Sequence, residues 1–281
     1  MSNPFTISNR HNLDILGNTH IPDIDPIACA ILIHGFKGYK DYGFIPLMAH
    51  DLCQQRILVH RINLSTSGMT NEVDTFSRPD LFELDTWMRQ VEDITQTCAA
   101  IREGAIPGKS LPLFLIGHSR GGASVLLAAG LNREKLSLSG VITINAVDRC
   151  CRMEETEQNE MLERGYTFTE SARTGQTLRI NSQWLQEQLD YPEDHDVLEQ
   201  AARAHVPACI IHGDADDAVN ISAGKAIVRK LNTHLHVLEG GNHVLNMKNP
   251  SSINAPRSEP FLKAVDGITR FICQQSVSDA V

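Results

Sequence analysis

The sequence predicts an α/β protein in which a mostly parallel central sheet is covered by helices on both faces. The first observation behind this prediction is an alternation, from about residue 27 to the end, of short apolar runs rich in β-formers with amphipathic segments. The second is that glycine, histidine and acidic residues gather directly after several of these runs. Such loops are typical of the carboxyl ends of parallel strands, where these folds bind their ligands.

Six apolar runs have the length and composition of buried strands, and an earlier one, residues 13–17, is expected to add an antiparallel edge strand. The chain of 281 residues is 42% hydrophobic and long enough to bury a large core, so we expect a single domain over residues 1–281. The six expected strands are Ile27–Ile33, Ile57–Ile62, Leu113–Ile116, Gly140–Ile144, Ala208–Ile211 and Leu235–Leu238.

The third strand leads into Gly117-His118-Ser119-Arg120-Gly121, which is followed by the apolar, helix-like stretch 123–129. This G-x-S-x-G pattern between strand and helix is typical of a nucleophile elbow, a turn too tight for side chains at the glycine positions. It lifts Ser119 Oγ out of the sheet and points the first amides of the helix toward a developing oxyanion. The alternative is a glycine and serine turn without chemistry, and the flanking strand and helix favour the elbow.

The alternation of strands and helices breaks between residues 146 and 204, a polar stretch with an expected helix at residues 182–189. Long interruptions inside a compact domain are usually functional, so we expect a small helical cap or lid over the carboxyl edge of the sheet. A solvated surface excursion is the alternative. Apolar residues at helical spacing then predict a closing helix between residues 255 and 274.

A serine hydroxyl is a weak nucleophile, so Ser119 requires a base, and the base requires a carboxylate that orients it. His243 suits the base because it follows the last expected strand and a Gly-Gly-Asn loop. Three aspartates in one loop, Asp214, Asp216 and Asp217, are candidates for the acid, and residue spacing does not choose among them. Each could instead cap the next helix, and Asp148 is a more distant fourth candidate.

Three motifs together resemble the α/β-hydrolase superfamily, in particular small serine hydrolases related to dienelactone hydrolase, prolyl-oligopeptidase-like proteins and cinnamoyl or feruloyl esterases. The resemblance extends from about residue 13 to residue 271 and implies the α/β-hydrolase fold. The motifs are His34-Gly35-Phe36-Lys37-Gly38 with Asp41-Tyr42-Gly43, the elbow 117–122, and His212-Gly213 with Asp216 and Val219, followed by Gly241-Asn242-His243. A further segment, 171–176, is also similar to one found in such relatives.

The resemblance implies roles for several residues. It makes Asp216 the acid, with Asp217 as the second choice, and it places the oxyanion hole at the backbone amides of Phe36 and Arg120. His34, just before the oxyanion turn, is then expected to shape the loop rather than act as a second base. The Arg120 side chain is expected to form a surface salt bridge, and the alternative is an anchor for a substrate carboxylate.

Composition restricts the partners. A net charge of −9 disfavours nucleic acid and anionic membrane surfaces, and no stretch approaches the roughly 20 apolar residues of a membrane span. The first residues lack the features of a signal peptide, so a cytoplasmic location is expected. Seven cysteines without C-x-x-C spacing predict reduced thiols and no zinc site.

These observations predict a serine hydrolase that cleaves carboxylic esters through Ser119, His243 and Asp216, with a small-molecule ester as substrate and no metal or organic cofactor. A peptidase, a thioesterase, a haloperoxidase-like enzyme and a non-catalytic ligand receptor on the same fold remain as alternatives. Phe36, Trp184 and Tyr191 are expected to line the substrate pocket. The sequence leaves open whether the protein forms a homodimer.

Overall fold

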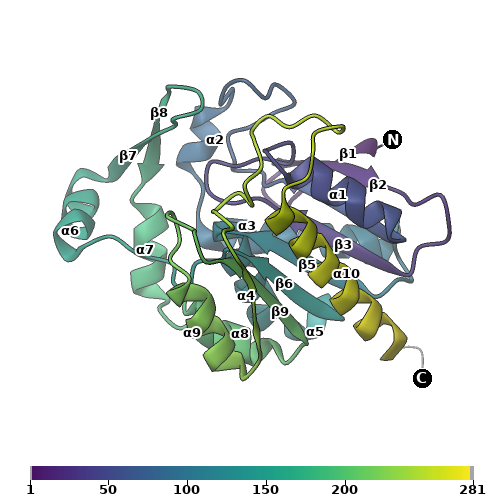
Figure 1. Cartoon of the computed structure of the whole chain (residues 1–281). Helices are drawn as coiled ribbons and strands as arrows, with labels where there is room; N and C mark the ends of the chain where they lie inside the picture. The colour runs from purple at the N-terminus through teal and green to yellow at the C-terminus, as the bar shows by residue number, and fades with distance from the viewer. Residues whose placement is uncertain (1, 279–281) are drawn as a thin grey trace.

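The computed structural model describes residues 2–278 and has an eight-stranded sheet at its centre, in the order β1-β2-β4-β3-β5-β6-β9-β10 (Figure 1). Strands β1 and β2 pair antiparallel, as do β2 and β4, whereas all other neighbours are parallel. The strands are β1 Ser2–Ser8, β2 Asp14–His20, β3 Ala28–Ile33, β4 Ile57–Asn63, β5 Leu113–His118, β6 Gly140–Ile144, β9 Ala208–Gly213 and β10 Leu235–Leu238.

The six strands expected from the apolar runs are therefore present, and the mostly parallel α/β architecture is confirmed. The expectation that residues 13–17 form the edge of the sheet is wrong, because β2 lies between β1 and β4. The edge strand is β1, whose Phe5 and Ile7 pack against the core while its other residues are mostly exposed. Pro4 suits this position, since an edge strand has amides that need no partner.

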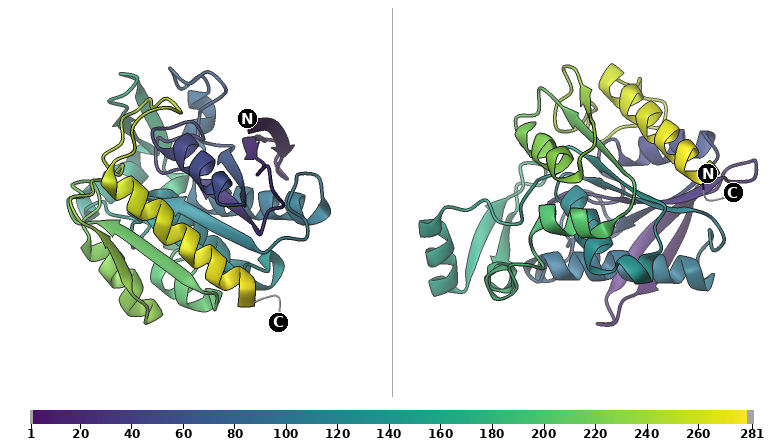
Figure 2. Two further views of the ribbon diagram at one scale, coloured as in Figure 1. Left: turned by 45° about the vertical axis from the view of Figure 1, so that its right-hand side comes forward. Right: turned by 90° about the horizontal axis from the view of Figure 1, so that it is seen from below.

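Helices cover both faces of the sheet (Figure 2). Successive residues of β3 alternate between two apolar cores: Ile31 and Ile33 face one, and Ala30 and Leu32 face the other. This alternation follows from the period of two along a strand. One core is closed by α3 Trp87–Glu103, α4 Arg120–Leu131, α8 Val197–Ala204 and α9 Ser222–Leu231, with the short α5 Arg133–Leu136 beside them; the other is closed by α1 Ile45–Gln54 and α10 Glu259–Ser278.

The segment 146–204, expected to be a small helical insertion, is not only helical. It contains α6 Glu155–Arg164, an antiparallel hairpin of β7 Tyr166–Glu170 and β8 Thr177–Asn181, α7 Gln183–Asp190 and α8. Helix α8 packs against α4 and so belongs to the body of the domain. The elements α6, β7 and β8 extend to one side of the sheet, and β8 packs against the short helix α2 Pro79–Glu83 (Figure 1).

Candidate active site

Ser119 lies in the turn between β5 and α4, with φ of 56° and ψ of −123°. The tightness of this turn explains the glycines around it. A Cβ atom on Gly117 would lie 2.2 Å from the carbonyl oxygen of Gly121, and one on Gly121 would lie 2.3 Å from the carbonyl oxygen of His34. Both distances are far shorter than van der Waals contact, so this backbone path requires glycine at both positions.

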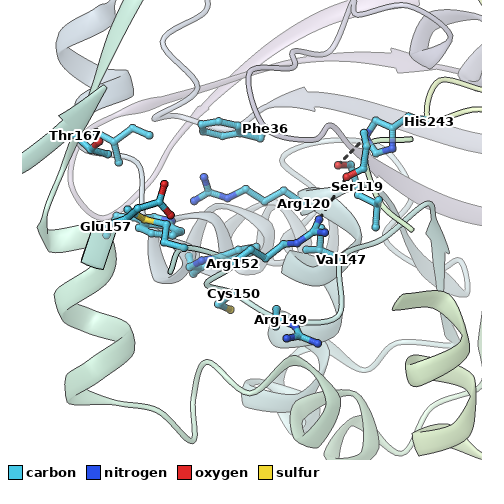
Figure 3. Close-up of a pocket in the computed structure, with 16 residues that line it drawn as sticks. Phe36, Ser119, Arg120, Val147, Arg149, Cys150, Arg152, Glu157, Thr167 and His243 are labelled. Atoms are coloured by element: carbon cyan, nitrogen blue, oxygen red, sulfur yellow. Dashed lines mark hydrogen bonds between the residues drawn. The ribbon is translucent and has the colours of Figure 1, made fainter. Parts of the chain in front are cut away.

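The structure brings Ser119, His243 and Asp216 into one hydrogen-bonded chain. His243 Nε2 lies 3.0 Å from Ser119 Oγ, and His243 Nδ1 lies 2.8 Å from Asp216 Oδ2 (Figure 3 shows the first pair). A carboxylate only accepts hydrogen bonds, so it selects the imidazole tautomer with the proton on Nδ1. Nε2 is then free to accept the hydroxyl proton of Ser119.

Asp216 differs from its neighbours in the same loop. Its side chain is fully buried, and its Oδ1 accepts hydrogen bonds from the amides of Ala218 and Val219 at 2.9 and 2.8 Å. Burial by itself would raise the pKa of Asp216, but the hydrogen bonds from His243 and these amides outweigh it, and the pKa lies below its ordinary value. The carboxyl group therefore remains ionised beside His243.

The other acidic candidates have different surroundings. Asp214 Oδ1 accepts a hydrogen bond from the Gly240 amide at 2.7 Å, which joins two surface loops. Asp217 is exposed, and Asp148 forms an ion pair with Arg149 at 3.3 Å. Only Asp216, among the four, is placed by the structure against His243.

Two residues that the sequence reasoning missed hold the His243 loop. His118 Nε2 donates a hydrogen bond to the His243 carbonyl at 2.8 Å, and Asn145 Nδ2 donates to the same carbonyl at 3.0 Å. Burial lowers the pKa of His118 to about 3, so its ring stays neutral. Asn145 also accepts a hydrogen bond from the Gly213 amide at 2.8 Å. Asn145 could have been found from the sequence, because it directly follows strand β6 at the carboxyl edge of the sheet.

The loop after β3 lies against the serine. A Cβ atom on Gly35 would lie 2.8 Å from Ser119 Cβ, so the Phe36 amide follows a point of close contact with Ser119. Arg120 is the first residue of α4, and its amide therefore has no acceptor within the helix. His34 uses both ring nitrogens, donating from Nδ1 to the Gly35 carbonyl and accepting at Nε2 from the Leu64 amide. Burial lowers its pKa to about 4, which agrees with a neutral, loop-shaping residue.

Two cavities meet at Ser119 and His243. The smaller, about 190 Å³, lies toward Tyr42, His118 and Val244. The larger, about 500 Å³, lies on the side of α4 and is mainly apolar and aromatic, with arginines among its lining (Figure 3). Its lining residues include Phe36, Trp87, Ser119, Arg120, Val147, Arg149, Cys150, Arg152, Met153, Glu157, Thr167, Ile180, Trp184 and His243.

Phe36 and Trp184 thus line a cavity as expected, but Tyr191 does not. Its side chain lies at the end of α7 and is 62% exposed. The expectation that Arg120 forms a surface salt bridge is also wrong, because its guanidinium is buried. Arg120 Nη2 lies 3.1 Å from Oδ2 of the buried Asp85, and the guanidinium stacks 4.5 Å from the ring centre of Trp87.

All seven cysteines are free thiols, and five of them are buried. Within residues 2–278 the structure groups no three histidine, cysteine or acidic side chains in a way that would hold a metal ion. Over the same residues, no helix combines the length and the apolar composition that crossing a bilayer demands.

Comparison with protein families gives a match of residues 30–254 to a model described as the alpha/beta hydrolase family. No match was found among the curated proteins. Among solved structures, Est1E from Butyrivibrio proteoclasticus with bound ferulic acid is 17% identical with a TM-score of 0.70, the match covering 97% of this chain and 99% of Est1E.

Two further solved structures are similar over nearly their whole length. An esterase domain from Rhodothermus marinus is 20% identical with a TM-score of 0.63, and the match covers 97% of this chain and 99% of that one. DcsB, in complex with a substrate analogue, is 14% identical with a TM-score of 0.76, and the match covers 99% of this chain and 100% of that one. At such identities these likenesses establish the fold.

Proposed function

Because this chain belongs to the alpha/beta hydrolase family, we propose that it is a serine hydrolase that cleaves carboxylic esters through Ser119, His243 and Asp216. The observation that carries the proposal is the unbroken chain of hydrogen bonds, 3.0 Å from serine to histidine and 2.8 Å from histidine to aspartate. The serine sits at an elbow beside a cavity of about 500 Å³, so a substrate carbonyl has room to reach it.

In the proposed reaction, His243 Nε2 takes the hydroxyl proton as Ser119 Oγ bonds to the carbonyl carbon of the ester. The oxyanion that forms accepts hydrogen bonds from the backbone amides of Phe36 and Arg120, each typically worth about 3 kcal/mol in such sites. His243 then returns its proton to the leaving alcohol as the ester bond breaks. A water molecule, deprotonated by His243, releases the acid from the acyl-enzyme in the same way.

Esters are favoured over amides and thioesters because two of the similar structures are described as Est1E, with ferulic acid bound, and as an esterase domain. Peptidases and thioesterases use the same kind of catalytic residues. Comparing the turnover of esters, thioesters and peptides therefore distinguishes the three activities. In this proposal the part of residues 146–204 that precedes α8 forms the cap of a single domain, and α8 belongs to its body. Trp184 of α7 and Thr167 of β7 already line the larger cavity from that segment.

The direct test is hydrolysis of short-chain 4-nitrophenyl esters by the wild type and by Ser119→Ala. The wild type should turn over, and the variant should lose at least about 10⁴-fold in kcat, because the nucleophile is gone. Ser222→Ala, in helix α9, is the matched control and should keep wild-type activity. Circular dichroism establishes that both variants fold.

Two results would contradict the proposal. Turnover that persists in folded Ser119→Ala would mean that another group carries the chemistry. A wild type that is inert toward esters, thioesters and peptides but binds small molecules measurably would identify the protein as a receptor that retains the three residues.

A further inference from the structure

The larger cavity has a local charge opposite to that of the whole chain. Arg120, Arg149 and Arg152 line it, against one acidic side chain, Glu157 (Figure 3). The chain as a whole has 25 basic and 34 acidic residues. A cavity beside a proposed nucleophile that concentrates cations in an acidic protein favours an anionic ligand.

Among the three arginines that line the cavity, Arg120 is the buried one, with 8% of its surface exposed. Its partner Asp85 is already occupied, because the Asp85 oxygens accept hydrogen bonds from Thr66 Oγ1 and from Gln90 Nε2. Within the described chain, Arg120 Nε and Nη2 are buried without an aligned hydrogen-bond acceptor, although Nη2 is close enough to Asp85 for an ion pair. Because these two nitrogens are sealed from solvent, Arg120 contributes its positive charge to the cavity wall that it lines.

Arg152 supplies a second cation. It is exposed, and its Nη1 lies 3.5 Å from the carbonyl oxygen of Ala218, in the loop that carries Asp216. Figure 3 shows that Arg120 and Arg152 both extend along the cavity. Arg149 differs, because the side chain of Asp148 already pairs with it at 3.3 Å.

The two cavities can be assigned to the two halves of an ester. The leaving-group oxygen must receive a proton from His243 Nε2. His243 lines both cavities, but its neighbour Val244 and its hydrogen-bond partner His118 line the smaller one, about 190 Å³. The leaving alcohol therefore fits the smaller cavity, and the acyl group fits the larger one. There, Phe36, Trp87 and Trp184 surround the Arg120 guanidinium with aromatic rings, their centres 4.5 to 6.0 Å away.

We propose that the acid half of the substrate has an apolar body and a second, free carboxylate, which Arg152 and Arg120 bind in the larger cavity. A carboxylate offers two coplanar acceptors that match the guanidinium fork, whereas the aromatic walls accept the apolar body. This inference rests on the proposed ester hydrolysis and narrows its substrate class to half-esters of dicarboxylic acids.

The test uses mono-4-nitrophenyl esters of adipic and suberic acid, compared with the same esters capped as methyl esters at the free carboxylate. The wild type should have a kcat/KM at least about tenfold higher for the anionic ester, which corresponds to one charge-assisted hydrogen bond. Arg152→Gln should lower the ratio of the two kcat/KM values about tenfold. Arg164→Gln removes the same charge from α6, outside the cavity, and should keep the wild-type ratio.

Arg120 needs a paired design, because removing it alone leaves Asp85 buried without a cation. The double variant Arg120→Met with Asp85→Asn keeps the buried site neutral and should also lower the ratio. Calorimetry on Ser119→Ala gives a readout without turnover: this variant should bind suberate at least about tenfold more tightly than dimethyl suberate, and adding Arg152→Gln should remove that preference.

The outcomes separate this inference from the proposed function. Serine-dependent cleavage of the capped esters, with no preference for the anionic ones, would overturn the carboxylate site and leave the ester hydrolase standing. Preferential binding of suberate without cleavage of any ester would support the carboxylate site and contradict the hydrolase. A preference for suberate that survives in Arg152→Gln and in the double variant would also overturn the proposed carboxylate site.

Discussion

Ser119 has a backbone conformation that non-glycine residues rarely adopt, and its neighbours compensate for it. Such a conformation costs of the order of 1–3 kcal/mol. The Ser119 amide donates a hydrogen bond to the Ile144 carbonyl at 2.9 Å, and its own carbonyl accepts one from the Gly122 amide at 2.9 Å. The turn is thus tied to β6 on one side and to α4 on the other, so the strained residue stays in place.

The acid can be identified by three matched substitutions in one loop. Asp216→Asn should lower kcat on the order of 10³ to 10⁴-fold, because an amide in that position no longer selects the imidazole tautomer that accepts the serine proton. Asp214→Asn and Asp217→Asn should stay within about tenfold of the wild type, since neither side chain contacts His243. Steady-state ester hydrolysis measures all three, and a larger loss at Asp217 than at Asp216 would reassign the acid.

At the level of elements, the hairpin β7–β8 is fastened to the body of the domain at its tip. Gln176 Oε1 accepts hydrogen bonds from the Phe76 amide at 2.8 Å and from Thr75 Oγ1 at 3.0 Å, and its Nε2 donates to the Phe76 carbonyl at 3.2 Å. Lys37 Nζ donates to the Glu170 carbonyl at 2.7 Å, which joins the loop of Phe36 to the same hairpin. The segment 171–176, similar to one in relatives, therefore has a structural explanation.

Gln176→Ala should loosen this hairpin. The loss of three hydrogen bonds, one from a backbone amide, is expected to cost about 1–3 kcal/mol of local stability and to speed amide hydrogen exchange in residues 166–181 at least about tenfold. Gln186→Ala is the matched control, because the side chain of Gln186 donates a hydrogen bond to Asp190 on the exposed side of α7. Mass spectrometry of exchanged peptides measures both. Equal exchange in the wild type and Gln176→Ala would mean that other contacts hold the hairpin.

For the whole molecule, buried neutral histidines predict a loss of stability in acid. His60 lies in β4, away from the candidate active site, and accepts a hydrogen bond from Thr19 Oγ1 while donating one to the Pro107 carbonyl. Burial lowers the pKa of His60 from 6.5 to about 4, outweighing the hydrogen bond to Pro107. As the pH falls, His60 therefore binds a proton near pH 6.5 in the unfolded chain but only near pH 4 in the folded chain.

The contribution of His60 to the free energy of unfolding is complete above pH 6.5 and is lost as the pH falls toward 4. Between pH 7 and pH 5 the loss should be about 2 kcal/mol. His60→Gln should remove this part of the pH dependence, whereas His236→Gln, an exposed position on β10, should keep it. Urea unfolding at both pH values measures the difference. If His60→Gln lost as much stability between pH 7 and pH 5 as the wild type does, His60 would not be the source of the pH dependence.

Much of the fold could be predicted from the sequence because its signals are local. The runs that became β3, β5 and β6 are continuous apolar segments, and the glycines at 117 and 121 mark a turn that no other residue allows. The edge strand β1 was missed because its alternation is interrupted by Pro4 and only part of it is buried. The hairpin in the insertion was missed because its strands are short and mostly polar.

The sequence by itself determined the order of the strands along the chain, the elbow at Ser119 and the choice of His243, since each depends on residues close together in sequence. Residue spacing left three aspartates of the 214–217 loop open and the family resemblance favoured Asp216, but only the tertiary structure brings Asp216 against His243 and buries Arg120 against Asp85 and Trp87. These contacts join strands and loops that are distant along the chain. Their geometry depends on how the whole sheet and its helices pack, which no local pattern encodes.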